Sequence, residues 1–435
     1  MLTKIKFKIE SELHKEYAWT ISVFAKYIGF NCEFVNEGED ILIAEHGMGD
    51  MQVSHFFRNT YLGGDYHFKG YFRKEPLHTN ASGKPDYIST CFYLLSYLQE
   101  YIDYTPDKYD RFPYNISLQK HFNCIDQNLV AQYFDALYES TPKLKSLVKK
   151  QERVTQYFLT HDIDSVYGAL GDNYGYLVKH GKIGTLLQLI FNHYLKTPDY
   201  LLLNKILDIE DAFDVRSTFF WLVNSGKGTR RINNADYEID AAPIKKIRSE
   251  IKARGWENGL HKSAGKDNFT NELKKQGELG LPINRNHYLI TELPNTFDDI
   301  ENSGIKLDSS MGFPDAIGFR NNYGLPIKPF HLKEKRAYNF VEVPLNVMDT
   351  SLKYYQNCNS KQAEKRILEF LEKNKTNTLL TILWHNNYFF DYADKGWFEL
   401  YKTVLQFIKD NGGEVTNAKK IMEEFNFKVS PQSYN

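Results

Sequence analysis

The chain contains the stretch Tyr157–Phe158–Leu159–Thr160–His161–Asp162–Ile163–Asp164, an apolar run that ends in two carboxylates. Its first four residues are typical of a buried β-strand. Because side chains alternate along an extended chain, Asp162 and Asp164 are expected to point to the same side of the strand end. Such a pair can divide its work, one carboxylate holding a cation while the other acts as a base. The alternative is an Asx turn or a helix cap that follows the strand.

Strands and helices alternate along the chain after Gln151. The further apolar runs expected to be strands are Ser217–Val223, Glu257–His261, Asn284–Leu289, Ile305–Ser309, Val341–Val347 and Leu379–His385. Amphipathic helices are expected between them, among them Ala242–Arg254, Gln362–Leu371 and Trp397–Lys409. This alternation is typical of parallel strands with helical crossovers. We therefore predict an α/β fold, a distorted (β/α) barrel of about seven parallel strands with its chemistry at the carboxyl ends of the strands.

The residues before Gln151 have a different character and are expected to form a separate N-terminal α/β domain of unknown role. Ile5 to Ile9 alternates like a strand, and Tyr17 to Ile28 carries apolar residues at helical spacing. Tyr87 to Tyr101 is a second expected helix, whereas residues 50–85 are expected to be hairpins and loops. The predicted division is residues 1–150 and residues 151–430.

The composition of the chain argues against a nucleic-acid-binding, disulfide-rich or membrane-spanning protein. With 54 Lys and Arg against 55 Asp and Glu, the 435-residue chain has a net charge of -1, so no nucleic-acid partner is expected. Four scattered cysteines without a CxxC pair exclude a thiolate zinc site and a disulfide framework. The charged start, Met1–Glu10, is unlike a signal peptide, and no apolar run approaches the roughly 20 residues that span a bilayer. We expect a cytoplasmic protein without a transmembrane segment, and the sequence indicates no particular oligomeric state.

Polar side chains recur where the predicted strands end. His261 closes one strand, and a histidine at such a position is a good ligand for zinc or a similar divalent ion. The short segment from Arg285 through His287 to Tyr288 is costly to bury unless its charges find partners. Asp308 and His385 end two further strands. Each position alone is weak evidence, but together they predict one polar site at one rim of the barrel.

In this pattern the chain resembles the polysaccharide deacetylases of the NodB-homology type, carbohydrate esterase family four. The motifs that carry the resemblance are Asp162–Asp164, Gly259–His261, Arg285–Tyr288, Asp308–Ser309 and Ile382–His385, within roughly residues 151–425. Ile382 stands where the family usually has leucine. A bacterial subgroup with an extra N-terminal domain is further suggested by Phe92–Ser96, Glu100–Tyr101, Asp110–Pro113, Gly318–Arg320 and Pro344–Asp349.

The resemblance implies a mechanism in which a divalent metal polarises an acetamide carbonyl and activates water. Asp162 would be the general base, with Arg285 fixing and charge-tuning it through an ion pair. His385 would be the general acid that protonates the leaving amine. The remaining implied roles are metal binding by Asp164 and His261, substrate positioning by Tyr288, and orientation of His385 by Asp308.

Two departures from the family concern the metal. The second family histidine falls four residues after the first, where this chain has Gly265, and the aspartates are separated by Ile163 rather than adjacent. His287 could supply the missing ligand, because catalytic zinc favours three protein ligands; otherwise it is a substrate or supporting group. Asp267 is a second possible substitute. The cofactor expected is a divalent metal, with zinc first, and the alternative is a metal-free site as in allantoinase-like relatives.

Two other segments need an interpretation. Thr296–Phe297–Asp298–Asp299 matches the family's usual first motif, but it follows Pro294 rather than a strand, so we expect a helix start. The insertion 165–214 is long for this fold and contains helical material. We expect it to cover the strand ends as a lid or substrate wall, or else to form a packed helical hairpin without contact to the site.

The leading hypothesis is therefore a hydrolase of the deacetylase type, which removes an N-acetyl group from a carbohydrate substrate in bacterial surface-polysaccharide assembly. One alternative is a metal-free C–N hydrolase of small cyclic amides. A catalytically silent carbohydrate-binding protein is the other, and the replacement of the second family histidine motivates it.

Overall fold

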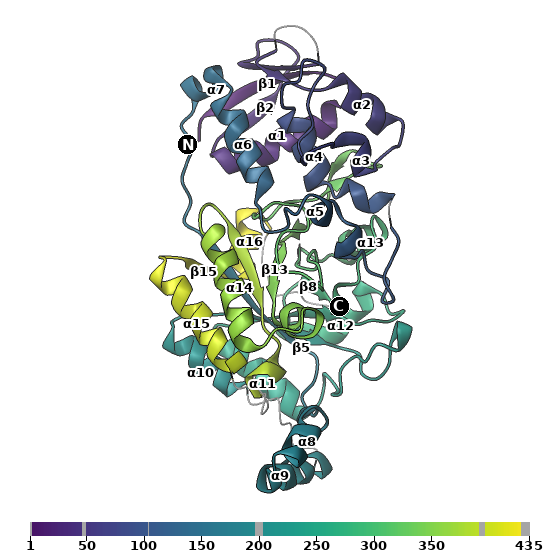
Figure 1. Ribbon diagram of the computed structural model, residues 1–435, viewed down its shortest axis with the longest axis vertical. Coiled ribbons are helices and arrows are strands. Elements are labelled where there is room, and N and C mark those ends of the chain that lie inside the picture. Colours follow the sequence, from purple (N-terminus) through teal and green to yellow (C-terminus); the bar gives the residue numbers. More distant parts are fainter. Residues whose placement is uncertain (1, 46–48, 103, 196–202, 391–395, 428–435) are drawn as a thin grey trace.

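A computed structural model describes residues 2–45, 49–102, 104–195, 203–390 and 396–427 of the chain. The N-terminal third forms one region of the molecule, and the remainder forms a barrel beside it (Figure 1). The barrel sheet has the order β12-β9-β8-β7-β6-β5-β14-β13, with β15 also paired to β5, and its neighbouring strands pair in parallel.

All of the strands predicted after Gln151 are present, which confirms the predicted fold class. The sheet adds β15, a strand that the sequence pattern did not indicate, along the first residues of β5. The strands are β5 (Gln156–Ile163), β6 (Thr218–Leu222), β7 (Glu257–Lys262), β8 (Ile283–Asn286), β9 (Leu307–Asp308), β12 (Val341–Glu342), β13 (Leu345–Met348), β14 (Leu379–Leu383) and β15 (Glu414–Thr416).

Pro344 divides one predicted strand into two and shows how the sheet closes. The predicted strand Val341–Val347 is split into β12 and β13, because proline has no N–H to donate to a ladder. These two strands lie at opposite ends of the hydrogen-bonded order. Only three Cα–Cα steps separate Glu342 from Leu345, a span of at most about 11 Å. The sheet must therefore curl until its two ends meet.

The barrel interior is layered by the alternation of side chains. An apolar layer formed by Phe158, Phe220, Ile283, Leu307, Val341 and Leu379 fills the amino end and is closed by α16 (Ala418–Glu424). Gly259 belongs to this layer, where a Cβ atom would come within 2.7 Å of Ile283 and 2.8 Å of Phe220. Positions two and four residues further along the strands point to the same interior, at the carboxyl end. The polar residues of the strand ends therefore face one another above an apolar floor.

Amphipathic helices cover the outside of the sheet (Figure 1). The predicted helices appear as α11 (Ala242–Ala253), α14 (Ser360–Lys373) and α15 (Gly396–Asp410), which bury their apolar faces against the sheet in the largest core of the molecule. Further helices are α10 (Asn204–Ala212), α12 (Phe269–Gln276) and α13 (Asn295–Ser303). Thr296–Asp299 lies at the start of α13, which confirms that this segment begins a helix.

The N-terminal region is built on a second parallel sheet, of order β2-β1-β3-β4. Its strands are β1 (Lys4–Glu10), β2 (Asn31–Phe34), β3 (Ile41–Ala44) and β4 (Met51–Gln52), and its helices include α1 (His14–Ile28), α4 (Tyr87–Leu95), α6 (Leu129–Glu139) and α7 (Pro142–Leu147). The expectation of only hairpins and loops in residues 50–85 is wrong, because α2 (His55–Leu62) and α3 (Phe68–Tyr71) lie there.

The two regions share buried contacts. Glu100 accepts two hydrogen bonds from the guanidinium of Arg320, at 2.8 and 2.6 Å, and both side chains are almost fully buried. Apolar residues of the barrel half, among them Tyr323 and Phe330 of β10 (Phe330–His331), pack in the core of the N-terminal region. The hairpin of β10 and β11 (Arg336–Ala337) thus belongs spatially to the first region, and the domain division at residue 150 stays a prediction.

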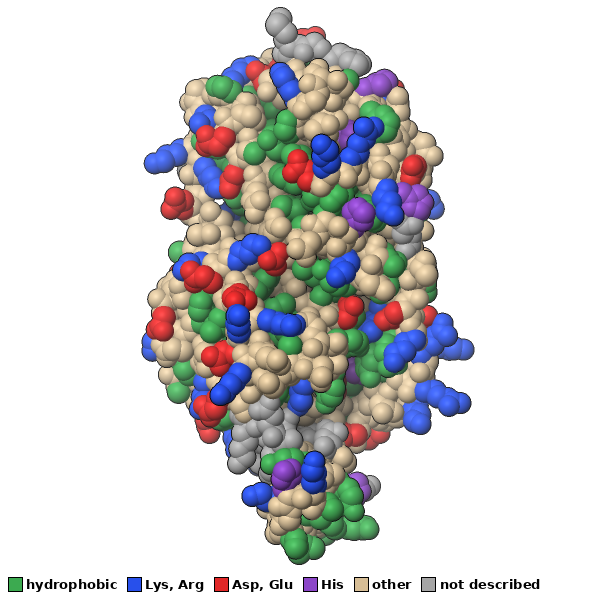
Figure 2. Space-filling model, in the orientation of Figure 1, with side chains coloured by type: hydrophobic (Ala, Val, Ile, Leu, Met, Phe, Trp, Pro, Cys, Tyr) green, Lys and Arg blue, Asp and Glu red, His purple; other side chains and the backbone are tan. Residues whose placement is uncertain are grey.

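The insertion after β5 forms a helical hairpin. Helices α8 (Ala169–Lys179) and α9 (Ile183–Tyr194) pack on each other around Ala169, Leu177 and Leu189 and project from the barrel (Figures 1 and 2). The prediction of a lid over the strand ends is wrong for the described residues of the hairpin, because none of them lines the pocket there. Among the described residues, no helix is long and apolar enough to span a membrane.

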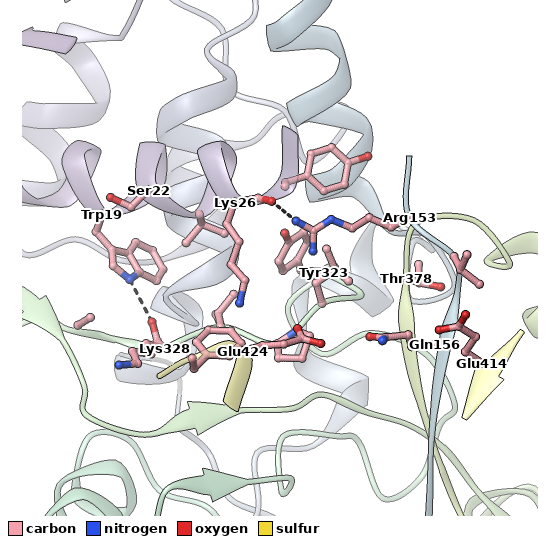
Figure 3. A pocket seen from close by; sticks show the side chains of 18 residues that line it. Trp19, Ser22, Lys26, Arg153, Gln156, Tyr323, Lys328, Thr378, Glu414 and Glu424 are labelled. Atoms are coloured by element: carbon pink, nitrogen blue, oxygen red, sulfur yellow. Dashed lines mark hydrogen bonds between the residues drawn. The ribbon is translucent and has the colours of Figure 1, made fainter. Parts of the chain in front are cut away.

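A cleft of about 500 Å³ separates α1 from the amino end of the barrel (Figure 3). Lys26 of α1 extends into it and places its ammonium 3.0 Å from the centre of the Phe425 ring. Desolvation lowers the pKa of Lys26 to about 7, and the nearby cations Arg153 and Lys328 act in the same direction against the opposing effect of Glu424. Because burial favours the neutral form of this amine, its positive charge destabilises the fold here.

We expect Lys26→Met to stabilise the protein by roughly 1–3 kcal/mol at pH 6, because it removes a desolvated charge and keeps the length of the side chain. Between pH 7 and the ordinary lysine value of 10.5, the unfolded wild-type chain binds more protons than the folded one. Wild-type stability therefore rises with pH across this window, and the advantage of the variant shrinks. Urea unfolding at pH 6 and pH 10 measures both effects. Exposed Lys361 provides the control variant Lys361→Met, and a destabilised Lys26→Met at pH 6 would contradict the assignment.

Candidate active site

Three strands, β5, β7 and β8, carry the polar residues of the carboxyl rim described first. Asp162 lies in β5 and Asp164 follows it by one residue, while His261 lies in β7 beside Arg285 of β8. Extended geometry at the end of β5 brings both aspartates to His261, whose Nε2 lies 3.6 Å from Asp162 Oδ2 and 3.2 Å from Asp164 Oδ1. The Asp-x-Asp spacing thus places both carboxylates beside the imidazole ring of His261.

Three potential ligand atoms converge beside this pair. His287 Nδ1 lies 3.1 Å from His261 Nε2 and 3.5 Å from Asp164 Oδ1. The two histidines come from neighbouring strand ends, and both rings are buried. Among the described residues, Asp164, His261 and His287 form the group whose ligand atoms lie close enough to hold one metal ion.

Each of the two histidines has one ring nitrogen that faces away from the other potential ligands, and the hydrogen bond of that nitrogen determines the tautomer of the ring. His261 Nδ1 lies 2.9 Å from the carbonyl oxygen of Arg285, and His287 Nε2 lies 2.9 Å from that of Asn233. A carbonyl can only accept, so each of these nitrogens carries the proton of its neutral ring. The inward nitrogens then carry lone pairs, and backbone carbonyls that fix histidine tautomers in this way are typical of metal sites.

The three acceptors fit a divalent ion by distance and by chemistry. Asp164 Oδ1 is buried and has no hydrogen-bond donor among the described residues, although the rest of its carboxylate opens to the pocket. Tetrahedral zinc with bonds of about 2.0–2.2 Å keeps its ligands about 3.3 Å apart, close to the separations observed here. Two imidazoles and one carboxylate are also a donor set that zinc accepts in catalytic sites. The arrangement therefore fits a divalent metal ion.

The pKa shifts of the site residues indicate that the site stabilises positive charge. Burial alone would lower the pKa of His261, but the carboxylates of Asp162 and Asp164 outweigh it and raise that pKa. Burial would likewise raise the pKa of Asp164, yet His287 and His261 hold it well below its usual range. A proton or a metal ion between these side chains would therefore be stabilised by the same negative charge, and the two would compete for the position.

Asp162 is held by a buried ion pair with Arg285. The Nη1 atom of Arg285 donates to Asp162 Oδ1 at 3.2 Å and to Thr160 Oγ1 at 2.7 Å. The other side of the guanidinium donates to the backbone oxygen of Ser309 at 2.9 Å and to its hydroxyl at 3.0 Å. With every face of the guanidinium engaged, Arg285 fixes the position of the Asp162 carboxylate.

His385 is positioned by Asp349, a residue to which the sequence analysis gave no role. Asp349 Oδ1 lies 2.6 Å from His385 Nδ1, and Asp349 Oδ2 accepts from the His385 backbone N–H at 2.6 Å. This leaves Nε2 of the ring facing the pocket, 3.7 Å from Asp164 Oδ2. Burial would lower the pKa of His385, but Asp349 outweighs it and raises the pKa to about 10.

The prediction that Asp308 orients His385 is corrected by this geometry. Asp308 accepts hydrogen bonds from Asn284 at 2.6 Å and from the N–H and hydroxyl of Ser310 at 3.0 and 2.9 Å. It lies on β9, which does not pair with β14, whereas Asp349 directly follows β13, the neighbour of β14. Asp308 is fully buried and ties β9 to β8 outside the pocket lining.

Gly265 and Asp267 do not belong to the group of three potential metal ligands, although His287 lines the same cavity as they do. Both line another cavity with Lys266 and Asn268. The carboxylate of Asp267 accepts hydrogen bonds from Lys275 at 2.8 Å and from Asn271 at 2.9 Å. Asp267 therefore lies outside the group of three potential ligands in this arrangement.

The site opens into a pocket of about 460 Å³ with an aromatic wall. Tyr288 lines it, as predicted for a substrate-positioning residue, with a backbone φ of 58° that bulky residues rarely adopt. Sequence reasoning missed the contribution of the N-terminal region, which supplies Lys108, Tyr109 and Arg111 to the lining. Arg111 donates to the Tyr355 hydroxyl at 2.9 Å and to the Tyr288 backbone oxygen at 3.4 Å, so a segment from outside the barrel completes the pocket.

Comparisons with known proteins give the following matches. Residues 8–145 match a family described as a family of unknown function (DUF7033). A search of curated proteins gives no significant match. Similar solved structures include a putative polysaccharide deacetylase from Mycobacterium smegmatis (13% identity, TM-score 0.40, 66% of this chain and 95% of that chain). Others are Puue allantoinase (13%, 0.40, 64% and 92%) and a CE4 family pseudoenzyme from Bacillus anthracis (12%, 0.28, 62% and 66%). These matches assign no activity to this chain.

In the metal-free protein, Asp349→Asn should lower the pKa of His385 from about 10 toward its ordinary value of 6.5, because burial is then opposed only by the smaller effects of Asp164 and Asp162. The wild-type pair stabilises the fold fully below pH 6.5, and this contribution is lost as the pH rises through about 10. NMR titration of the His385 ring measures the shift. Asp308→Asn, which leaves the Asp349 contact intact, is the matched control, and an unchanged His385 pKa in Asp349→Asn would refute the assignment.

Proposed function

We propose that the protein is a metal-dependent hydrolase of the polysaccharide deacetylase type, which removes an N-acetyl group from a sugar in bacterial surface-polysaccharide biosynthesis. The observation that carries the proposal is the convergence of Asp164, His261 and His287 beside a buried Asp162–Arg285 pair and a His385–Asp349 pair. The order of these residues along the chain also matches the motif order that the sequence analysis recognised.

A divalent ion, for which zinc is our first candidate, would supply Lewis acidity toward the acyl carbonyl and toward water. Asp164, His261 and His287 would hold it. In this proposal His287 takes the place of the family histidine that Gly265 replaces, because its Nδ1 faces the same gap as His261 Nε2.

Asp162 is proposed as the general base. Its Oδ1 is engaged by Arg285, while its Oδ2 lies 3.6 Å from His261 Nε2, toward the proposed ligand set. One oxygen is thus anchored and the other faces the place where water would be activated. A base must lie within reach of the proton that it takes, and this orientation provides that reach.

His385 is proposed as the general acid. The Asp349 contact raises its pKa to about 10, so the ring carries a proton at neutral pH and has Nε2 directed into the pocket. An amine that leaves from an amide must be protonated as the bond breaks, and a positioned imidazolium can donate that proton. A bound metal ion would lower this pKa toward the working range of an acid catalyst, because it adds positive charge near the ring.

The pocket lining supports a carbohydrate substrate. Tyr109, Tyr288, Tyr354, Tyr355 and Tyr388 line it. Aromatic faces accept the apolar faces of sugar rings, while their hydroxyl groups tolerate a wet surface. Tyr288 and Tyr109 pack edge to face with ring centres 5.1 Å apart, at the contact between the barrel and the N-terminal segment.

Acetate release from N-acetylglucosamine oligomers tests the proposal. We expect activity in the zinc-loaded protein, its loss on chelation, and its return when zinc or cobalt is restored. Asp162→Asn should reduce kcat by about 10²–10⁴-fold without loss of bound metal, because it removes the proposed base but none of the three ligands. Asp267→Asn, which changes a carboxylate outside the pocket, is the matched control and should retain activity.

Other results would favour the remaining hypotheses. Hydrolysis of cyclic amides that survives complete removal of metal would contradict metal dependence and support a metal-free C–N hydrolase. Saccharide binding without turnover in metal-loaded wild type, unchanged by Asp162→Asn, would support a silent carbohydrate-binding protein.

A further inference from the structure

The helical hairpin formed by α8 and α9 exposes an unusual number of large apolar side chains. They are Tyr174, Val178, Ile183, Leu187, Phe191, Tyr194 and Leu195, each between 51% and 81% exposed. Single exposed apolar residues are common, but contiguous patches mark binding surfaces. Figure 2 shows this apolar surface on the projection at one end of the molecule.

On α9 these side chains form one continuous stripe. Ile183, Leu187 and Phe191 follow at four-residue steps, and Tyr194 falls on the same side of a helix with 3.6 residues per turn. The opposite side holds Leu186 and Leu189, which pack in the small core of the hairpin. The helix is therefore apolar on two faces, one satisfied inside the hairpin and the other turned to solvent.

The charge of this segment is one-sided. No Asp or Glu occurs between Asp172 and Asp199, in a chain whose 435 residues include 55 acidic ones. The last residue of α8 is Lys179, and the turn that follows it carries His180 and Lys182. This composition gives no reason to expect another protein as the partner. Apolar, aromatic and basic residues without acidic ones are instead typical of segments that bind an anionic lipid interface.

We propose that the α8–α9 hairpin binds the surface of an anionic lipid bilayer, with its exposed apolar stripe inserted among the acyl chains and its basic turn at the headgroups. The α9 helix has 12 residues, too few to span a bilayer but sufficient to lie in its interface. The inference is independent of the hydrolase proposal.

The hairpin also places the pocket near the proposed membrane. Asp164 and Ser165 line the pocket, and α8 begins at Ala169, a few residues later. The hairpin therefore emerges from the same rim of the barrel as the candidate active site. Membrane binding through it would bring the pocket mouth to the bilayer side of the protein.

Flotation with vesicles of phosphatidylcholine and phosphatidylglycerol tests the proposal with the full-length protein. We expect binding that weakens with salt and falls strongly when phosphatidylglycerol is omitted. The triple variant Ile183→Ser, Leu187→Ser, Phe191→Ser should lose at least a hundredfold in the partition coefficient. Phe56→Ser with Leu62→Ser, which removes exposed apolar residues of α2, is the matched control and should bind as wild type does.

A second measurement does not depend on the stability of the hairpin variant. The fluorescence of tryptophan in Phe191→Trp should be quenched by vesicles with brominated acyl chains, whereas that in Phe56→Trp should not. The proposal is overturned if wild type does not float with anionic vesicles or if Phe191→Trp is not quenched. It is equally overturned if light scattering shows a dimer that the triple serine variant abolishes while vesicle binding is absent, because the stripe then covers a second copy of the chain.

Discussion

Three lone pairs directed at one point are the constraint around which the candidate site is organised. His261 Nε2, His287 Nδ1 and Asp164 Oδ1 lie 3.1–3.5 Å apart, and backbone carbonyls hold the outer nitrogens of both rings as donors. Acceptors at these distances repel one another unless positive charge lies between them. The carboxylates of Asp162 and Asp164 raise the pKa of His261 against the effect of its burial, as expected where acceptors converge.

Two charged pairs lie beside the three converging ligand atoms, one presenting a carboxylate and the other an imidazolium. Arg285 is fully buried and directs the Asp162 carboxylate toward the histidines, while Asp349 keeps His385 protonated. The Asp162–Arg285 pair and the Asp349–His385 pair each combine opposite charges, so neither pair needs a metal ion to balance its charge. The apolar floor of the barrel lies directly beneath, which keeps the effective dielectric low and strengthens these interactions. A potential base and a potential acid thus flank the cation site with their positions already set.

Local patterns in the sequence were sufficient to predict the barrel and most of the residues at its rim. Alternation along single strands places Asp162 and Asp164 on one side, and the rule that parallel strands end at one edge brings in His261, Arg285 and His385. The partner of His385 could not be found in this way, because Asp308 and Asp349 both end strands and only the sheet order decides between them. The sequence pattern also gave no indication of Arg111 at the pocket, since that contact depends on how two distant regions pack. The lid prediction failed for the described residues of the α8–α9 hairpin, because helical periodicity predicts a hairpin but not the direction in which it projects.

The most direct test of this account is the anomalous scattering of a crystal grown with zinc and measured at the zinc absorption edge. One ion is expected at the carboxyl rim, bonded to His261 Nε2, His287 Nδ1 and Asp164 at about 2.0–2.2 Å. A zinc ion bound without His287, or the absence of any ion between these three residues at saturating zinc, would contradict the account.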